Sequence, residues 1–292
     1  MARFEHLLHA LDPYGTESNV VRADRVKSGR PRAFDPSGEP GLSVIVLNKD
    51  RPDLLEALWD VWPGIVSIFE SHGVDVELLV GDTGSTDDAA CRLLEHPPLR
   101  SRVWRDLEYQ FSRCNNDLFD EAAYDTVLFM NNDVLLGDRP DALWDAYHLV
   151  ASDVSIGALG AVLYFADGRV QHAGIDFFER SDLFGFCYHP GAGGSISLAR
   201  GAVFDAPATT GAFLMTRARA FAQVGGFDER YAAECQDVDL CLRLDRVGLG
   251  TKVAHLGGLL HLENGTRQPG DENWDDRALF TRRWNSYVEA RR

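Results

Sequence analysis

The feature that most constrains this chain is an apolar run that ends abruptly in three polar residues. Residues 127–130 have the composition of a buried strand, and Asn131-Asn132-Asp133 follow directly. Ligands of open α/β sheets collect just beyond the carboxyl ends of such strands. Asp133 could hold a divalent cation there, because a hard cation takes carboxylate oxygen and leaves room for substrate phosphates. The alternative is a capped strand end, in which Asn and Asp only satisfy the backbone of a turn.

Strands alternate with helices through the first half of the chain. Residues 42–47, 76–80 and 103–104 predict strands, and residues 52–69 predict a helix that Pro63 should kink or split. This alternation predicts an α/β fold with a mostly parallel central sheet flanked by helices. The second half is less regular, with strands predicted at 156–165, 209–215 and 253–260, and helices from 237 and around 280–287.

Composition limits the class of protein and its partners. Lys and Arg number 29 against 45 Asp and Glu, a formal net charge of −16, which argues against nucleic acid or an anionic membrane surface as the main partner. No apolar run approaches the ~20 residues of a membrane span. Five cysteines without a C-x-x-C pair fit a reducing compartment, and the N-terminus lacks the apolar core of a secretory signal. We therefore expect a soluble cytoplasmic protein.

The chain shows no internal repeat and no clear linker, so we expect one domain over residues 41–292 after an N-terminal extension of residues 1–40. Phe4, Leu7, Leu8 and Leu11 of the extension fall on one helical face. That face could dock on the main domain, on a partner or peripherally on a membrane, and docking on its own domain is the favoured interpretation.

Three acidic residues follow predicted parallel strands, where the sheet would bring them together. Asp50, Asp82 and Asp133 could serve a nucleotide, since a carboxylate accepts from base or ribose and a metal bridges the phosphates. The chain has no G-x-G-x-x-G after the first strand and no G-x-x-x-x-G-K-[ST], so neither a dinucleotide fold nor a P-loop fits. The phosphate charge would then need a metal.

Asp237 and Asp239 lie two residues apart at the start of a predicted helix. One could act as a general base if burial and a neighbouring carboxylate raise its pKa. Alternatively, both only cap the helix and meet its dipole. We favour the base for Asp237 and the cap for Asp239, and Glu234 is the competing candidate base.

His261 follows the last predicted strand, and Glu263 is close behind it. A histidine in this place is commonly a core or surface residue, but a nitrogen and oxygen pair in one loop also suits a metal site or its outer shell. His172 and His189 are weaker candidates. The five cysteines show no metal-ligand spacing, which indicates packing residues.

An ordered set of six motifs resembles family 2 glycosyltransferases, inverting enzymes of the GT-A fold. They are Val44-Ile45-Val46-Leu47-Asn48, Asp82-Thr83-Gly84-Ser85-Thr86-Asp87, Asn131-Asn132-Asp133 in place of the D-x-D, Gly225-Gly226-Phe227-Asp228-Glu229, Asp237-Val238-Asp239-Leu240-Cys241-Leu242-Arg243 in the E-D region, and His261 with its H-x-E-x-x-[ST]-R run. Two further motifs are most similar to bacterial members that build rhamnose-containing or O-antigen-type polysaccharide, namely Phe111-Ser112-Arg113-Cys114-Asn115-Asn116 and Gln171-His172-Ala173-Gly174.

The resemblance implies a nucleotide-binding N-terminal half, an acceptor-binding C-terminal half, and roles for individual residues. Asp237 would be the catalytic base, and Asp133 with His261 would hold Mn²⁺ or Mg²⁺. The residues implied to bind the nucleotide-sugar are Leu47, Asn48, Asp50, Asp82, Gly84, Asn116, Asn131, Asn132 and Gly211. Two positions depart from the family pattern: Asn131-Asn132-Asp133 retains one carboxylate of the D-x-D, and Gln236 replaces the acid before Asp237.

The implied activity is transfer of a sugar from a UDP- or dTDP-sugar to a hydroxyl of a glycan or lipid-linked glycan, in synthesis of bacterial surface polysaccharide. A nucleotidyltransferase would need a Gly-rich loop that residues 47–52 lack, and a phosphatase using Asp82 would need a second carboxylate where Gly84 stands. The alternative from another class is a non-catalytic sugar-nucleotide-binding or scaffold protein of a polysaccharide assembly complex.

Overall fold

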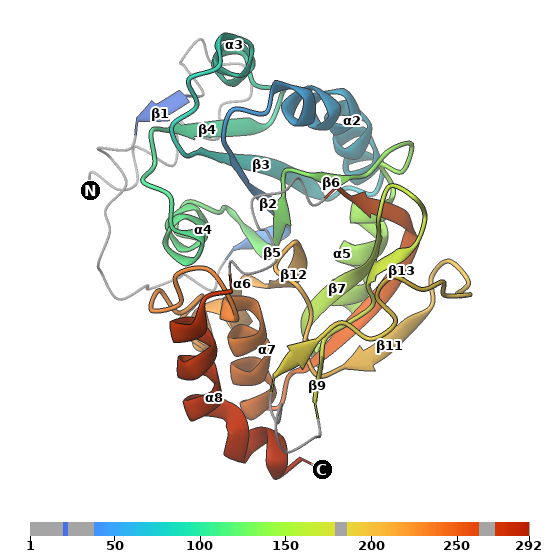
Figure 1. Ribbon diagram of the computed structural model, residues 1–292. Coiled ribbons are helices and arrows are strands. Elements are labelled where there is room, and N and C mark those ends of the chain that lie inside the picture. The colour runs from blue at the N-terminus through green and yellow to red at the C-terminus, as the bar shows by residue number, and fades with distance from the viewer. Residues whose placement is uncertain (1–19, 23–37, 179–185, 263–271, 292) are drawn as a thin grey trace.

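The computed structural model describes residues 20–22, 38–178, 186–262 and 272–291 (Figure 1). Most strands join one 11-stranded sheet, whose main path runs β1-β4-β3-β2-β5-β12-β7-β13-β11. They are β1 (Val20–Arg22), β2 (Glu39–Asn48), β3 (Asp75–Asp82), β4 (Ser101–Arg105), β5 (Tyr124–Asn131), β6 (Val134–Leu135), β7 (Ile156–Tyr164), β8 (Val170–His172), β11 (Val203–Ala206), β12 (Phe213–Arg217) and β13 (Gly250–His261). A separate pair joins β9 (Asp176–Phe177) to β10 (Cys187–Tyr188).

The first half of the sheet is parallel, as predicted. β1, β4, β3, β2 and β5 pair in parallel register, and this register aligns Leu47 with Gly81 and with Asn131, and Asn48 with Asp82. The carboxyl ends of these strands therefore meet at one edge of the sheet, where their polar loops lie together. β1 belongs to the predicted N-terminal extension, whose residues 4–11 lie outside the described part of the chain.

The second half of the sheet mixes directions. β12 inserts antiparallel between β5 and β7, whereas β13 runs parallel to β7 and antiparallel to β11 and β6. The last residues of β13 thus return to the edge at which β5 ends, because His261 lies opposite Val134. This pairing brings two regions that are far apart in the sequence to the same edge.

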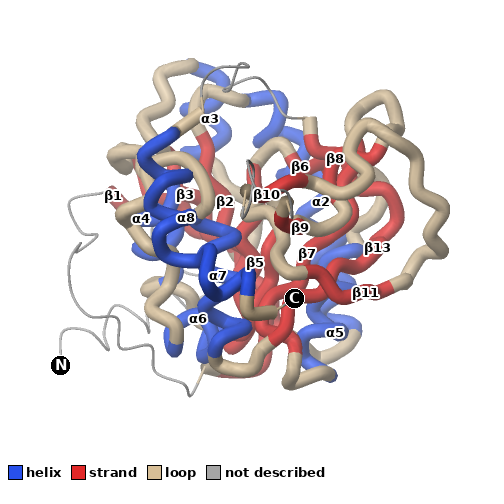
Figure 2. Tube along the Cα trace, turned by 60° about the horizontal axis from the view of Figure 1, so that its bottom comes forward, coloured by secondary structure: helices blue, strands red, loops and turns tan. Residues whose placement is uncertain are grey.

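Helices cover both faces of the sheet (Figures 1 and 2). Alternating side chains of the strands divide the apolar core into two clusters, one on each face. One face carries α2 (Pro52–Ser71), α3 (Asp88–Glu95) and α5 (Ala142–Ser152). The other carries α4 (Phe111–Phe119), α6 (Ala218–Gln223), α7 (Gln236–Arg246) and α8 (Trp274–Glu289).

Helix α2 differs from the prediction at Pro63. Pro52 opens it in the first turn, where a missing N–H costs least. The helix then continues past Pro63 to Ser71, so the predicted split does not occur. Trp62, Ile65 and Phe69 are all fully buried and hold both sides of the proline against the core. Among the described residues, no helix is long and apolar enough to cross a membrane.

Candidate active site

Asp133 and His261 come together at the edge where β5 and β13 end. Asp133 Oδ1 lies 3.1 Å from His261 Nε2, and each side chain is only 14% exposed. The Nδ1 of His261 lies 2.6 Å from Gln171 Oε1. Because an amide oxygen only accepts, this contact places a proton on Nδ1, so that the neutral form of the ring has its lone pair on Nε2, facing a carboxylate. Two acceptors that face each other in this way fit a cation between them.

These two side chains suffice for the metals that the resemblance implies. Within the described ranges, no group of three or more His, Cys, Asp or Glu side chains could hold a metal ion. Mg²⁺ is commonly bound through one or two carboxylates, with substrate phosphates and water completing the shell. Asp133 and His261 therefore fit a cation that binds together with a diphosphate. Glu263, the other oxygen predicted near this site, lies outside the described residues.

Asp237 is joined to the same edge through the start of β12. Its Oδ2 accepts from the backbone N–H of Gly211 at 2.8 Å, and its Oδ1 accepts from Val238 N–H at 2.8 Å. The next residue, Ala212, accepts from Asn131 N–H at 2.9 Å. A side chain at Gly211 would approach Phe111 to 3.1 Å, so glycine allows this close packing. The half-buried carboxylate of Asp237 thus lies at a helix start beside the strand ends.

Asn48 and Asn132 form the polar floor between β2 and β5. Asn132 Nδ2 donates to Asn48 Oδ1 at 2.9 Å. Asn48 is 2% exposed, and its Nδ2 finds no hydrogen-bond partner among the described residues. A buried donor without an acceptor is costly, so this amide nitrogen suits an oxygen of a bound ligand. Leu47 is half-buried beside it and aligns with Asn131.

Asp50 ties together the two loops that follow β2 and β3. Its Oδ1 accepts from the backbone N–H groups of Asp87 at 2.8 Å and Thr86 at 2.5 Å, while its own N–H donates to Ser85 Oγ at 2.8 Å. These backbone donors, from Asp87 first and Thr86 second, hold the pKa of Asp50 below its ordinary value. Gly84 gives the second loop its left-handed backbone, with φ of +91°.

Two of the predicted nucleotide-binding side chains already bond strongly within the protein. Asp82 is fully buried, accepts from the hydroxyl and N–H of Ser85, and pairs with Arg105 Nε at 2.9 Å. Asn116 is 1% exposed and bonds both the N–H and the carbonyl of Phe227. Both therefore shape the loops of the edge, and direct contact with a ligand stays a prediction.

The other candidates on and beside α7 have structural partners. Glu234, the competing base, pairs with Arg277 Nε at 2.7 Å. Asp239 is fully buried and bonds Arg243 at 2.7 Å and Trp284 Nε1 at 2.8 Å, so the predicted helix cap is wrong and the residue serves the interior. The five cysteines are free thiols, and burial raises the pKa of Cys241 to about 12, as expected of a packing residue.

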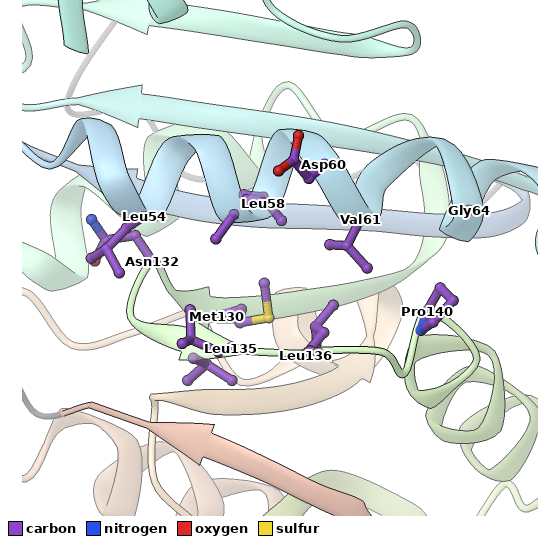
Figure 3. Close-up of a pocket in the computed structure, with 13 residues that line it drawn as sticks. Leu54, Leu58, Asp60, Val61, Gly64, Met130, Asn132, Leu135, Leu136 and Pro140 are labelled. Atoms are coloured by element: carbon purple, nitrogen blue, oxygen red, sulfur yellow. The ribbon is translucent and has the colours of Figure 1, made fainter. Parts of the chain in front are cut away.

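A cavity of the described structure lies beside this edge (Figure 3). It has a volume of about 440 Å³ and is lined by the side of α2 and by residues 130–140. Asn132 is the one predicted site residue that lines it, and the other lining groups are mostly apolar, such as Leu54, Leu58 and Met130. The cavity therefore adjoins the polar site and is distinct from the Asp133–His261 pair.

This fold is that of the GT-A glycosyltransferases. A mannosyltransferase of Pyrobaculum calidifontis, solved with GDP-Man and Mn²⁺, matches with a TM-score of 0.53 at 17% identity over 90% of this chain and 66% of that chain. GalNAc-T7, solved with UDP, GalNAc and Mn²⁺, matches with a TM-score of 0.60 at 9% identity, over 88% and 50%. The predicted α/β fold of this type is thus confirmed.

Sequence relatives point to the same class. The O-antigen biosynthesis protein RfbC of Myxococcus xanthus is 32% identical over 241 residues, 79% of this chain and 18% of the relative. The uncharacterized protein y4gI of Sinorhizobium fredii is 28% identical over 260 residues, 87% of this chain and 28% of the relative. The chain spans less than a third of either relative, and no family model matches it. Together with the fold, RfbC confirms the predicted resemblance to O-antigen-type glycosyltransferases.

Proposed function

We propose that the chain is an inverting, metal-dependent glycosyltransferase that moves a sugar from a UDP- or dTDP-sugar to a hydroxyl of a glycan or lipid-linked glycan. The observation that supports the proposal most is the Asp133–His261 pair after β5, with Asp237 bonded to Gly211 next to Ala212, which pairs with Asn131 at the end of the same strand. RfbC, a protein of O-antigen biosynthesis, supports surface polysaccharide as the product. The proposal includes a cytoplasmic location, with peripheral contact to the membrane through which the enzyme would reach a lipid-linked acceptor.

The first half of the sheet would hold the nucleotide. Loops after β2 and β3, joined by Asp50 and Ser85, would form the walls for the nucleoside. The unpartnered Nδ2 of Asn48 would donate to a donor oxygen. Asp133 and His261 would hold Mn²⁺ or Mg²⁺, which when bound neutralises charge on a departing diphosphate.

Asp237 would act on the acceptor. Its carboxylate takes the proton of the attacking hydroxyl while the hydroxyl oxygen bonds the anomeric carbon from the face opposite the diphosphate. The bond from that carbon to the diphosphate oxygen breaks at the same time, so the configuration inverts. The Gly211 and Val238 N–H groups fix the direction of the carboxylate throughout.

A thermal-shift panel tests the donor half of the proposal. UDP, dTDP, GDP and their sugars are added with Mn²⁺, with Mg²⁺ and with chelator, to the wild type and to Asp133→Ala. A ligand at about 100 times its Kd stabilises the folded state by about 2.7 kcal/mol. We expect a metal-dependent shift for one nucleotide, and we expect Asp133→Ala to lose the metal-dependent part.

Other results of the panel would point elsewhere. An equal shift in Asp133→Ala with metal present would contradict the assigned ligand. A nucleotide that binds without any transfer to a glycan acceptor would favour the sugar-nucleotide-binding scaffold, a reading supported by Asn131 and Gln236 standing where the family carries acids.

A further inference from the structure

Strand β8 carries a motif whose role the transfer chemistry leaves unexplained, Gln171-His172-Ala173-Gly174. Successive side chains of a strand point to opposite faces. Gln171 accordingly contacts His261, whereas His172 contacts Thr209 and His189. The glutamine is therefore the member of the motif that reaches the candidate metal site.

Two hydrogen bonds fix the orientation of the Gln171 amide. Its Nε2 donates to the backbone carbonyl of His261 at 3.3 Å, and its Oε1 lies 2.6 Å from His261 Nδ1. A flipped amide would place its NH₂ against Nδ1 and its oxygen against a carbonyl, and that carbonyl has no proton to donate. Of the two neutral tautomers of His261, the pair of contacts thus selects the one that carries its proton on Nδ1.

The same tautomer presents the Nε2 lone pair to Asp133 Oδ1, 3.1 Å away. The amide nitrogen of Asn131 lies 3.4 Å from that Nε2, and an amide nitrogen only donates, which agrees with an acceptor there. We propose that Gln171 is a positioning residue that prepares His261 Nε2 as a neutral metal ligand. This inference rests on the proposed function for the presence of the metal.

The rest of the motif holds Gln171 in place. The neutral ring of His172 accepts from Gly174 N–H at 3.2 Å, and burial, first of its causes, lowers the His172 pKa. Gly174 has φ of +91°, a backbone that L side chains rarely adopt, and an added Cβ would meet Ala206 Cβ at 2.9 Å. After this turn, Ile175 bridges to Ala208. The N–H and the carbonyl of Ile175 both bond the backbone of Ala208, so the segment after Gln171 is fixed to its neighbour.

Nuclear magnetic resonance of the histidine nitrogens tests the tautomer directly. The full chain is labelled with ¹⁵N-histidine and measured in mildly alkaline buffer, where imidazoles are neutral, without metal, nucleotide or acceptor. His261→Asn identifies the His261 signals among the nine histidines. We expect the proton on Nδ1 in the wild type. In Gln171→Leu we expect it on Nε2, where it would donate to Asp133. The same tautomer in both proteins, or a doubly protonated ring in the wild type, would overturn the inference.

A titration with Mn²⁺ alone tests the consequence for metal affinity. Binding is measured from the electron paramagnetic resonance signal of the free ion. Loss of an outer-shell partner typically weakens metal binding by about 10- to 100-fold, and we expect a loss of that size in Gln171→Leu. Gln171→Glu should restore part of it, because a carboxylate also accepts from Nδ1–H but cannot donate to the His261 carbonyl. Gln223→Leu, on the exposed end of α6, is the matched control.

The two tests separate this inference from the proposed function. Unchanged Mn²⁺ affinity in Gln171→Leu, a loss that Gln171→Glu does not restore even in part, or no binding of Mn²⁺ to the wild type would overturn the positioning role. A failure of sugar transfer with the expected tautomers and Mn²⁺ affinities would instead reject the proposed function and leave the role of Gln171 standing.

Discussion

Two aspartates of α7, separated by one residue, lie in opposite surroundings. Asp237 is half-buried at the edge of the sheet, and the bonds described for its carboxylate come from backbone N–H groups. Asp239 is fully buried between α7 and α8, where Arg243, Arg283 and Trp284 bond it. Arg243 and Arg283 pair with the second carboxylate, whereas backbone N–H groups hold the direction of the first.

The same contrast holds for the two regions around them. At the sheet edge, Asn48 Nδ2 lacks a partner among the described residues and two acceptors face each other at Asp133 and His261. Between α7 and α8, opposite charges meet at 2.7 to 2.9 Å. A buried donor without a partner, such as Asn48 Nδ2, indicates a place for a ligand, and groups that satisfy each other indicate stability. Substitutions should therefore separate activity from folding.

The largest expected effect is on transfer by Asp237→Asn. A positioned base typically contributes about 10²- to 10⁴-fold in rate, so we expect a loss of that size in the rate of sugar transfer. Asparagine can still accept from Gly211 N–H, and nucleotide affinity in a binding titration should therefore remain. Asp205→Asn, at an exposed ion pair with Lys252, is the matched control. Equal losses of transfer and of nucleotide binding would contradict the role of Asp237.

Asp239→Asn should act on stability and leave the chemistry intact. Breaking a buried ion pair from one side typically costs about 3–5 kcal/mol, because the remaining charge is left uncompensated. We expect the free energy of unfolding, from urea titration, to fall by about that amount, since Arg243 and Arg283 lose their carboxylate. If Asp239→Asn were as stable as the wild type but had lost sugar transfer, Asp239 would take part in the reaction. The contrast between Asp237 and Asp239 would then be wrong.

The smallest expected effect concerns pH and Asp228, at the rim of the same cluster. The guanidinium of Arg230, and then that of Arg283, hold the pKa of Asp228 well below its ordinary value. A carboxylate with a lowered pKa stabilises the fold above the unfolded pKa, about 3.9, and the stabilisation is lost as pH falls through the folded value. Because Arg230 is exposed to solvent, we expect Asp228→Asn to cost only about 1 kcal/mol at neutral pH.

Urea unfolding of both proteins between about pH 7 and about pH 3 measures this effect. The difference in the free energy of unfolding between wild type and Asp228→Asn should shrink toward the acid end. A difference that stays constant over the range would show that the charge of Asp228 contributes nothing to stability.

Much of the fold could be predicted because its signals are local. Strands β2, β3 and β5 are mostly apolar and end in polar residues, and helices fill the intervals. The continuity of α2 could not be predicted, because it depends on the buried neighbours of Pro63. The cap of α3 is Asp87, whose side chain accepts from the N–H groups of Ala89 and Ala90.

The part of the site that lies at strand ends could be predicted from the sequence. Asp133 and His261 end strands, and the parallel register places strand ends together. The roles of Gln171 and Asp239 depend on contacts with residues 90 and 45 positions away, which no local pattern specifies. Arg105 likewise pairs with Asp82 only because β4 and β3 are neighbours in the sheet. Local chemistry therefore identifies the candidates, and tertiary packing decides which remain free for a ligand.

Anomalous diffraction from a crystal of the full chain with Mn²⁺ and the nucleotide found in the thermal-shift panel would test the site most directly. We expect one manganese peak between Asp133 Oδ1 and His261 Nε2, at about 2.0–2.2 Å from each, with the diphosphate as a further ligand. Bound nucleotide with manganese elsewhere, or with no manganese at these two side chains, would contradict the assignment of this sheet edge as the centre of transfer.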